Sequence, residues 1–371
     1  MHRKTWMEID LDAIEDNIRT AEEVSGKDVI AVVKADGYGL GDLAVARSAM
    51  DAGAKMLAVS SCDEAMILRN KGYKDQLLIL GHTDTVDLPQ LIKKQVAVPA
   101  YSLQWVKNAL EAGCAGLRVH IKVDTGMNRI GFKDSAEIRT AIRELTAAGA
   151  VVEGIFTHFA CADSDPEFTK QQYEKFTEAV MAAGHTFRWI HCDNSEAALS
   201  FKDDLSNAVR FGIGMYGISE TYQGLRHAVS LWSRIFMVKQ VPAGETIGYG
   251  ATYRTEEPEW IATMPIGYAD GLIRKNQGRC VYINGEYVPI VGRVCMDQTM
   301  IRLPHPMEED SPVEIFGPHI SLEDMAKDLD TIPYEIISRI SERVTRIYTR
   351  GGKTIDEFNG RVIVSKYNPE K

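Results

Sequence analysis

Short apolar runs alternate with amphipathic stretches from residue 11 to about residue 217. The stretches have apolar positions at helical spacing, as in Leu11–Glu23 and Phe168–Ala183. The apolar runs begin near Val29, Met56, Leu77, Val96, Leu117, Val151, Trp189 and Ala208. Short continuous runs separated by helices are typical of parallel strands buried on both faces. Eight such strands in roughly 200 residues predict an α/β chain with a TIM-like (β/α)8 barrel, and a doubly wound sheet ranks second.

Beyond about Ser230 the pattern changes to short β-like runs punctuated by turns. The predicted strands are Ile235–Val241, Trp260–Met264, Cys280–Ile283, Tyr287–Val291 and Val313–Phe316. Pro242–Glu245 and Asn284–Glu286 have the composition of hairpin turns, and helices are predicted at Ser321–Leu329 and Pro333–Ser341. The chain therefore divides into a barrel over residues 1–225 and a mostly-β C-terminal domain over residues 226–371. The first few residues are candidates for the β domain.

Composition and charge narrow the class of protein. The 371 residues are 45% apolar and 25% charged, as in soluble globular proteins. With 42 basic and 52 acidic residues the net charge is −10, which disfavours nucleic acid and anionic membranes as partners. No apolar run approaches the roughly 18–20 residues of a membrane helix. The start lacks an apolar signal segment, so we expect a cytoplasmic protein.

Cysteines and histidines are scattered. None of the six cysteines forms a C-x-x-C pair, which argues against a disulfide framework and against a structural zinc site. We expect buried, reduced thiols. The nine histidines show no H-E-x-x-H spacing, so a metal enzyme is not expected.

In a barrel, chemistry takes place where the strands end, at their carboxyl termini. Lys34 directly follows the apolar run Val29–Val33. Desolvation at such a position lowers the pKa of an amine and makes it a nucleophile, and the alternative is a lysine that extends into solvent. The glycines of the following Gly37–Gly41 are common in phosphate loops, but the segment lacks G-K-[ST].

Charged and polar residues also follow the fifth and sixth predicted strands. Alternation places Lys122 and Asp124 on one face, where two charges in a barrel interior are costly unless they are paired or functional. A structural Lys–Asp pair is the alternative to a functional site. His158 follows the sixth strand at the same level, where a hydrogen-bonded core histidine is the alternative.

The seventh and eighth strands are followed by Asn194-Ser195 and by Arg210–Gly217. Asn194 or Ser195 either caps the next helix or contacts a ligand. Barrels often hold a phosphate on backbone N–H groups of these two loops, and Ser195 with the amides of Gly212 and Ile213 fits that role. A reactive lysine, a phosphate site and an inward arginine on one rim together suggest pyridoxal phosphate, held as a Schiff base of Lys34.

The segment Ala31–Gly39 resembles the pyridoxal-attachment signature of bacterial alanine racemases. The likeness continues in family order, almost to the end of the chain, through Lys122–Gly131, Thr157–Phe159, Asn194–Ser195, Val209–Ile213, Gly248–Tyr253, Gly267–Gly271, Val294–Gln298 and Tyr334–Glu335. The resemblance implies a barrel plus a β domain in a homodimer whose subunits share their active sites. It also implies interconversion of L- and D-alanine, which supplies D-alanine for peptidoglycan.

The resemblance assigns the catalytic roles residue by residue. Lys34 would bind the cofactor and act as the base for D-alanine, and Tyr249 of the partner subunit would be the base for L-alanine. Arg210 would face the pyridine nitrogen, and His158 would join Arg210 and Tyr249 in a hydrogen-bond network. Arg129 would contact the cofactor and the substrate carboxylate, with Lys122, carbamylated in many family members, behind it.

The remaining implied roles are binding and access. The phosphate would be bound by Tyr38, Ser195, Gly212, Ile213 and Tyr334. Met296 would donate its backbone N–H to the substrate carboxylate. The access corridor would be lined by Asp163, Tyr268, Arg274, Arg293 and Asp297.

Four places depart from the usual family pattern and leave the choice of substrate open: Leu40, Cys192–Asp193, Arg339 and Thr345. The bulky Tyr334 favours alanine, and a serine or broader-specificity racemase is the main alternative. A pyridoxal-phosphate decarboxylase is disfavoured, because such enzymes usually place an acidic group where Arg210 stands. A non-enzymatic pyridoxal-phosphate-binding protein is disfavoured, because those proteins are single barrels.

Overall fold

The computed structural model of the chain describes residues 3–360. It divides into two compact units. One is Ala13–Arg226, and the other is the described part of Met1–Asp12 and His227–Lys371. Residues 1–2 and 361–371 of the predicted domains lie outside the described range.

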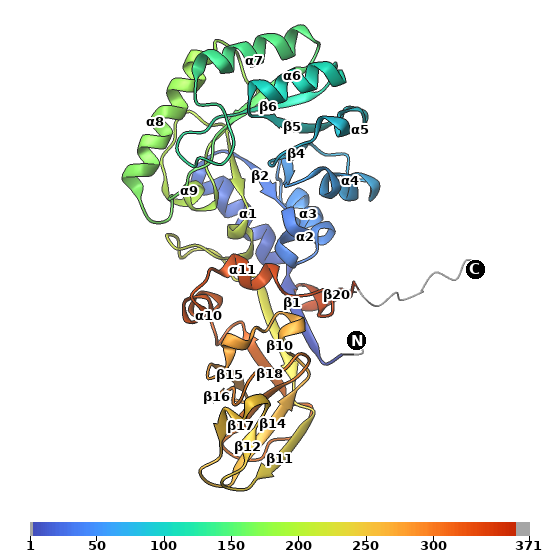
Figure 1. Ribbon diagram of the computed structural model, residues 1–371, viewed down its shortest axis with the longest axis vertical. Coiled ribbons are helices and arrows are strands. Elements are labelled where there is room, and N and C mark those ends of the chain that lie inside the picture. The colour runs from blue at the N-terminus through green and yellow to red at the C-terminus, as the bar shows by residue number, and fades with distance from the viewer. Residues whose placement is uncertain (1–2, 361–371) are drawn as a thin grey trace, which may run out of the picture. The chain divides into compact units, whose positions relative to one another are not determined.

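Eight parallel strands form the sheet of the first unit, in the order β8-β7-β6-β5-β4-β3-β2-β9 (Figure 1). Backbone hydrogen bonds from Asn207 N to Ile190 O and from Arg210 N to Asp193 O, both 3.0 Å, join its two edges into a barrel. The strands are β2 (Asp28–Val32), β3 (Met56–Val59), β4 (Leu77–Ile79), β5 (Val96–Ala100), β6 (Arg118–Lys122), β7 (Val151–Phe156), β8 (Trp189–His191) and β9 (Ala208–Phe211). The barrel prediction is confirmed, because each predicted apolar run forms one of these strands.

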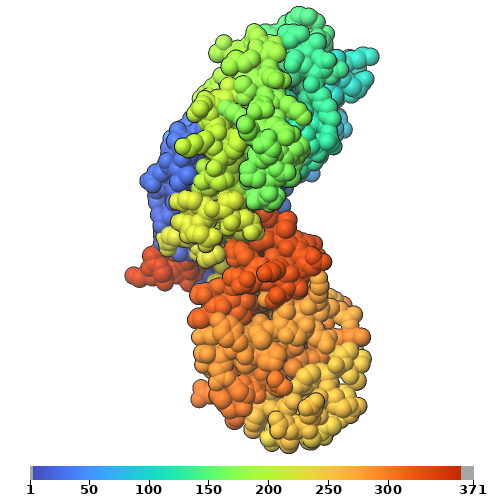
Figure 2. All heavy atoms as spheres, turned by 90° about the vertical axis from the view of Figure 1, so that its left-hand side faces the viewer, coloured from blue at the N-terminus to red at the C-terminus, as the bar shows by residue number. Residues whose placement is uncertain are grey.

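Helices follow the strands and cover the barrel from outside (Figure 1). They are α1 (Leu11–Ser25), α2 (Lys34–Gly39), α3 (Asp42–Asp51), α4 (Cys62–Asn70), α5 (Leu88–Lys93), α6 (Leu103–Ala112), α7 (Ser135–Ala147), α8 (Pro166–Ala183) and α9 (Ser195–Ser200). Side-chain oxygens of Ser61, Ser102 and Asp134 accept backbone N–H groups and begin α4, α6 and α7. Helix α8 buries one stripe, including Phe176 and Val180, and its outer face covers the side of the unit seen in Figure 2.

A seven-stranded sheet organises the second unit, in the order β16-β15-β18-β10-β1-β19-β20. Its inner strand β1 (Thr5–Asp10) pairs antiparallel with β10 (Val229–Arg234) and parallel with β19 (Thr345–Arg350). The other strands of this unit are β11 (Met237–Val241), β12 (Thr246–Ile247), β13 (Tyr253–Arg254), β14 (Glu259–Met264), β15 (Cys280–Ile283), β16 (Glu286–Pro289), β17 (Thr299–Leu303), β18 (Pro312–Phe316) and β20 (Lys353–Phe358). Two helices, α10 (Leu322–Leu329) and α11 (Pro333–Ser338), confirm the helical predictions.

One of the two predicted hairpins is present. Asn284 and Gly285 have φ of 48° and 92° and join β15 to β16, as expected of a tight hairpin turn. The hairpin predicted at Pro242–Glu245 is wrong, because β11 pairs with β14 and β12 pairs with β13. The segment makes a turn, but its flanking strands pair with others.

All six cysteines are free. Cys114 and Cys192 are buried as predicted, whereas Cys280 is exposed and the other three are half-buried. The prediction of buried thiols is therefore wrong for most of them, because Cys62 and Cys280 are the first residues of α4 and β15, and Cys161 and Cys295 lie in loops. Within residues 3–360, no helix combines the length and apolarity needed to cross a membrane.

Candidate active site

Lys34 stands where β2 ends, at the start of a strained turn. The next four residues, Ala35 to Tyr38, have φ between 54° and 62°. A left-handed turn costs roughly 1–2 kcal/mol for each non-glycine residue. Hydrogen bonds offset this cost: Ala35 N–H donates to Glu64 Oε1 (2.8 Å), and the hydroxyl of Tyr216 donates to Gly37 O (2.8 Å). The turn holds the Lys34 amine at the carboxyl end of the barrel.

The amine of Lys34 lies in a cationic, partly desolvated place. Its Nζ is 6.0 Å from the centre of the Tyr38 ring. Burial, together with the charges of Arg129 and Arg210, lowers the pKa of Lys34 against the opposing charge of Glu64. The lower pKa increases the fraction of free amine, which the sequence analysis expected of a nucleophile.

Arg210, on β9, is buried in the barrel. Its Nη1 contacts His191 Nδ1 (2.9 Å) and His191 O (2.9 Å). Its Nη2 contacts Thr157 O (2.8 Å), Cys192 O (2.8 Å) and His158 Nδ1 (3.1 Å). None of the described residues accepts a hydrogen bond from its Nε. Burial lowers the pKa of Arg210 only to about 10, so the side chain stays cationic and keeps this donor at neutral pH.

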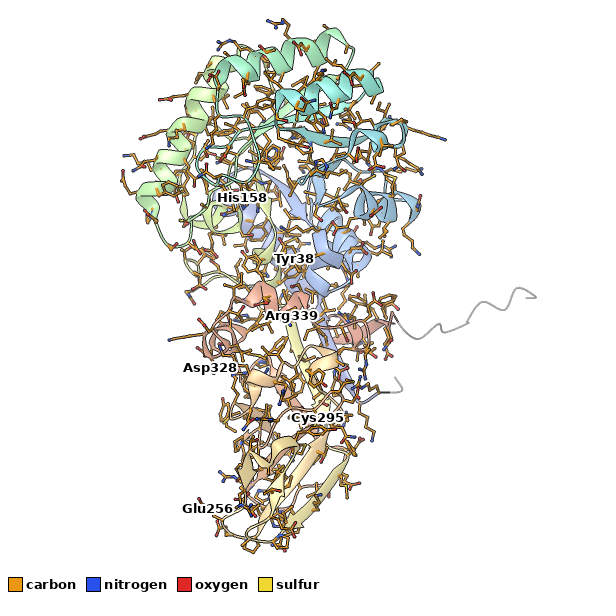
Figure 3. The ribbon with its side chains drawn as sticks, in the orientation of Figure 1. Tyr38, His158, Glu256, Cys295, Asp328 and Arg339 are labelled. Atoms are coloured by element: carbon orange, nitrogen blue, oxygen red, sulfur yellow. The ribbon has the colours of Figure 1, made fainter. Side chains whose placement is uncertain are left out.

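His158 follows β7 and is held beside Arg210. Tyr38 and His158, both labelled in Figure 3, come from the loops after the first and sixth barrel strands. Burial, and then the charges of Arg210 and Arg129, lower the pKa of His158 well below its usual value. The ring is therefore neutral, and its Nδ1 accepts from the guanidinium.

Lys122 and Asp124 do not form the structural pair considered above. Lys122 Nζ donates to Val123 O at 2.7 Å, and Asp124 Oδ1 accepts from the backbone N–H groups of Gly126 and Asn128. No ion pair joins the two side chains in the described part of the chain. Burial, followed by the charge of Arg210, lowers the pKa of Lys122 to about 7. Lys122 is thus partly neutral at pH 7, with a reactive amine inside the barrel.

Ser195 and Gly212 meet at the loops after β8 and β9. The N–H of Gly212 donates to Ser195 Oγ at 2.9 Å, and that of Gly214 approaches the same oxygen at 3.3 Å. Asn194, not Ser195, caps α9, because its side chain accepts from Ala197 N (3.1 Å). The structure therefore brings Ser195 and Gly212 together, with Ile213 buried next to them.

The departure at Cys192–Asp193 belongs to a buried charged cluster. Lys27 Nζ bridges Asp193 Oδ2 (3.0 Å) and Asp203 Oδ2 (2.9 Å), and Cys192 Sγ lies 3.1 Å from the same Asp203 oxygen. Cys192, Asp193 and Asp203 are close enough together to ligate a metal ion. The Lys27 ammonium already supplies a cation to both carboxylates. Leu40, the other departure in this unit, is fully buried.

The remaining expected site residues are exposed, most of them in the second unit. Four of these are large side chains with high exposed fractions: Tyr249 (71%), Met296 (52%), Tyr268 (42%) and Tyr334 (38%). Tyr249 lies between Gly248 and Gly250, whose φ values of 71° and 73° favour glycine. Asp297 of this unit pairs with Arg343. The other charged residues expected in the corridor are exposed: Asp163 in the first unit, and Arg274 and Arg293 in the second.

Sequence reasoning missed His191, His120 and Glu64. His191 is the last residue of β8, as Lys122 is of β6, so the same strand-end rule identifies it. His120 lies two residues before Lys122 and shares its face of the strand. Glu64 lies in α4, and no periodicity in the sequence connects it to Lys34.

Both units match domains of a known protein family. The model of the alanine racemase N-terminal domain matches residues 9–220, and that of the C-terminal domain matches residues 228–348. The chain belongs to the alanine racemase family. The predicted resemblance is thus confirmed over nearly the whole chain.

Curated alanine racemases and solved structures of alanine racemases match this chain over nearly their full lengths. An alanine racemase of Geobacillus stearothermophilus is 40% identical to this chain, in a match that covers 96% of this chain and 97% of the relative. The crystal structure of alanine racemase from Bacillus anthracis with bound L-Ala-P matches with a TM-score of 0.92 at 39% identity. The match covers 97% of this chain and 98% of the Bacillus anthracis chain. A histidine racemase from Leuconostoc mesenteroides also matches, with a TM-score of 0.88 at 28% identity. The match covers 94% of this chain and 99% of the histidine racemase. The alanine racemase fold therefore also occurs in a protein named for a different amino acid.

Proposed function

We propose that this protein is a pyridoxal-phosphate-dependent alanine racemase that interconverts L- and D-alanine and supplies D-alanine for peptidoglycan. One observation supports this most: the Lys34 amine, with its lowered pKa, stands on the same barrel rim as the buried cation Arg210. We further propose that the protein acts in the cytoplasm.

The residues present fit pyridoxal phosphate. Lys34 would bind its aldehyde, and Arg210 Nε, which no described residue uses as a donor, would face the pyridine nitrogen. Glycine at 212 allows the Tyr38 hydroxyl to approach the backbone, because a Cβ on Gly212 would lie only 2.4 Å from that oxygen. The phosphate would be held there by Tyr38, Ser195, Gly212 and Ile213, with Tyr334 as a further ligand. When bound, the cofactor makes the α-proton of an attached amino acid acidic.

The character of Arg210 favours racemisation over decarboxylation. A guanidinium has donors only and stays protonated, so it can donate a hydrogen bond to a ring nitrogen but cannot accept one. An acidic group at this position would stabilise a protonated ring nitrogen and strengthen electron withdrawal. Arg210 therefore suits a reaction that only removes and returns one proton.

Racemisation needs a base on each face of the α-carbon. We propose Lys34 for the face from which D-alanine loses its proton and Tyr249 for the opposite face. His158 would orient the tyrosine. Arg129 would hold the substrate carboxylate with help from the Met296 N–H, and Lys122 would orient Arg129.

A homodimer with shared sites accounts for the exposed side chains of the second unit. Tyr249 and Met296 have exposed side chains, which a partner subunit can reach. In the proposed dimer the partner subunit supplies Tyr249 to the barrel. The corridor to the site would be lined by Asp163, Tyr268, Arg274, Arg293 and Asp297.

A panel of L-amino acids followed by chiral chromatography tests the proposal. We expect alanine to be racemised fastest, with serine and histidine, the larger candidates, at least tenfold slower in kcat/KM, because a lost fit of about 1.4 kcal/mol is a factor of ten. Lys34→Ala should abolish activity and the visible absorbance of the bound cofactor. Retention of that absorbance in the variant would contradict the role of Lys34, and faster turnover of serine or histidine would change the assigned substrate.

A further inference from the structure

A row of side chains crosses the barrel interior from Arg210 to the ion pair between Arg118 and the buried Glu153. Arg210 Nη1 lies 2.9 Å from His191 Nδ1, and His191 Nε2 lies 2.9 Å from His120 Nδ1. His120 Nε2 lies 3.6 Å from Glu153 Oε1. Glu153 in turn accepts two hydrogen bonds from Arg118, at 2.9 Å and 2.8 Å. The row joins β9, β8, β6 and β7.

The chemistry of the groups gives the row a direction. A guanidinium can only donate, so His191 Nδ1 must accept from Arg210. His191 then carries its proton on Nε2 and donates it to His120 Nδ1. His120 in turn carries its proton on Nε2, pointing at Glu153. Burial lowers the pKa of both rings, which keeps each histidine neutral with a single N–H.

The far end of the row is a carboxylate. Against the opposing effect of its burial, the neighbouring His120 and Arg118 lower the pKa of Glu153, so it is ionised at neutral pH. No described atom lies within hydrogen-bond distance of His120 Nε2. At 3.6 Å in a buried place, the negative charge of Glu153 still favours the tautomer with its N–H toward it.

Two features of β7 are built around this arrangement. The pairing of β6 with β7 shifts by one residue between Val119 and His120, so that His120 pairs with Gly154 and Glu153 is the extra residue. Such an extra residue re-aims a side chain. A Cβ on Gly154 would lie 2.3 Å from His120 Nδ1, the atom that accepts from His191. Glycine at 154 thus makes room for the ring in the position that the row needs.

We propose that Glu153 and His120 are positioning residues that fix the tautomer of His191 and, through it, the orientation of the Arg210 guanidinium. This inference rests on the proposed function, in which Arg210 Nε faces the pyridine nitrogen of the cofactor. Without the carboxylate, only the guanidinium opposes the reversed row, in which His120 carries its proton on Nδ1 and His191 therefore carries its own on Nδ1 as well. Two donors, His191 Nδ1–H and Arg210 Nη1–H, would face each other at hydrogen-bond distance.

The direct test is nitrogen NMR of the holoenzyme labelled with ¹⁵N-histidine. Protonated and unprotonated ring nitrogens have well-separated chemical shifts. In His120→Gln the two ring-nitrogen signals of His120 disappear, which assigns them, and the signals of the neighbouring His191 move, which assigns those. We expect His191 and His120 in the wild-type protein both to be protonated on Nε2. A wild-type spectrum with either ring protonated on Nδ1 overturns the proposal, whatever the behaviour of any variant.

Glu153→Met tests the effect on the reaction. We expect the Nδ1-protonated tautomer to become populated in both histidines and kcat to fall about tenfold, the factor for one lost hydrogen bond to a charged group, with KM within about twofold. Glu153→Gln keeps an acceptor oxygen and should restore the tautomers and most of kcat. Glu15→Met is the matched control, because Glu15 is as buried as Glu153 and pairs with Arg19.

The results of these variants distinguish a positioning role of Glu153 from a general effect of losing a buried carboxylate. An equal loss of kcat in Glu15→Met and Glu153→Met, or an unchanged tautomer with unchanged kcat in Glu153→Met, overturns the positioning role. If Glu153→Met does not fold, Gly154→Ala displaces the His120 ring instead and carries the same expectations. A wild-type protein that racemises no amino acid would refute the proposed function and leave the tautomers measurable.

Discussion

The hydroxyl of Tyr38 occupies the space that a side chain on Gly212 would need: a Cβ on Gly212 would lie 2.4 Å from Tyr38 Oη and 3.2 Å from Cζ. The φ of Gly212 is −122°, a value that any residue adopts, so backbone strain does not require glycine there. The close approach of Tyr38 does. The pair forms a wall of the proposed phosphate site.

Gly212→Ala should therefore displace the Tyr38 hydroxyl and weaken cofactor binding by about tenfold, since one hydrogen bond to a charged group is lost. Titration of the cofactor-free protein with pyridoxal phosphate, followed by absorbance, measures the change. Tyr38→Phe removes the overlapping oxygen, so the double variant should bind better than the sum of the two single losses predicts. Additive losses would show that the two residues do not share a site.

Tyr249→Phe should slow exchange of the α-proton mainly for L-alanine. Phenylalanine keeps the shape of the side chain but removes the hydroxyl that we propose as the base on that side. Exchange into deuterated water, measured for each enantiomer by proton NMR, separates the two faces. Equal slowing for both enantiomers would contradict the two-base assignment, and Tyr253→Phe, a tyrosine bonded to Glu259 in the same unit, is the control.

Lys122 should react with carbon dioxide as pH rises through about 7, because only a neutral amine forms a carbamate and burial lowers the pKa of Lys122 to about 7. With ¹³C-bicarbonate, a carbamate carbon signal should grow between pH 6 and 8. Lys122→Ala should lack the signal. A signal that persists in that variant would belong to another amine, and a wild-type protein without one would leave Lys122 unmodified.

Lys27→Met should destabilise the protein by about 3–5 kcal/mol, because it leaves Asp193 and Asp203 buried without their shared cation. Urea unfolding followed by tryptophan fluorescence measures the loss. Lys107→Met, at the exposed helix pair Lys107–Glu111, should cost at most about 1 kcal/mol. Similar losses in both variants would show that the cluster contributes no more than a surface pair.

The loss in Lys27→Met should also be larger at pH 8 than at pH 5. Burial raises the pKa of Asp193 to about 6, above its unfolded value of 3.8. The folded state therefore holds more protons than the unfolded state between about pH 4 and 6, and stability from this group falls as pH rises through that window. At pH 5 Asp193 is largely neutral and needs Lys27 less. A larger loss at pH 5 would contradict this assignment of the charges.

Strands dominated by apolar residues were predictable, whereas strands such as β19 and β20 were not. The barrel strand β3 is buried at every position, and its four residues are all apolar. Strand β20 is exposed at every position, and β19 has only two apolar residues, Ile347 and Tyr348, between two Thr-Arg pairs. Strand β1 pairs with β19, more than 330 positions away, a partner that no local pattern specifies.

The sequence by itself determined which residues end the barrel strands, because apolar runs mark strands and chemistry follows where they stop. Lys34, Lys122, His158 and Arg210 were identifiable on that ground. Only the tertiary structure decided how they are connected: Lys122 does not pair with Asp124, and Arg210 is held by His191. Hydrogen bonds depend on distances across neighbouring strands and on one-residue shifts such as that at Glu153, which the periodicity of a single strand does not encode.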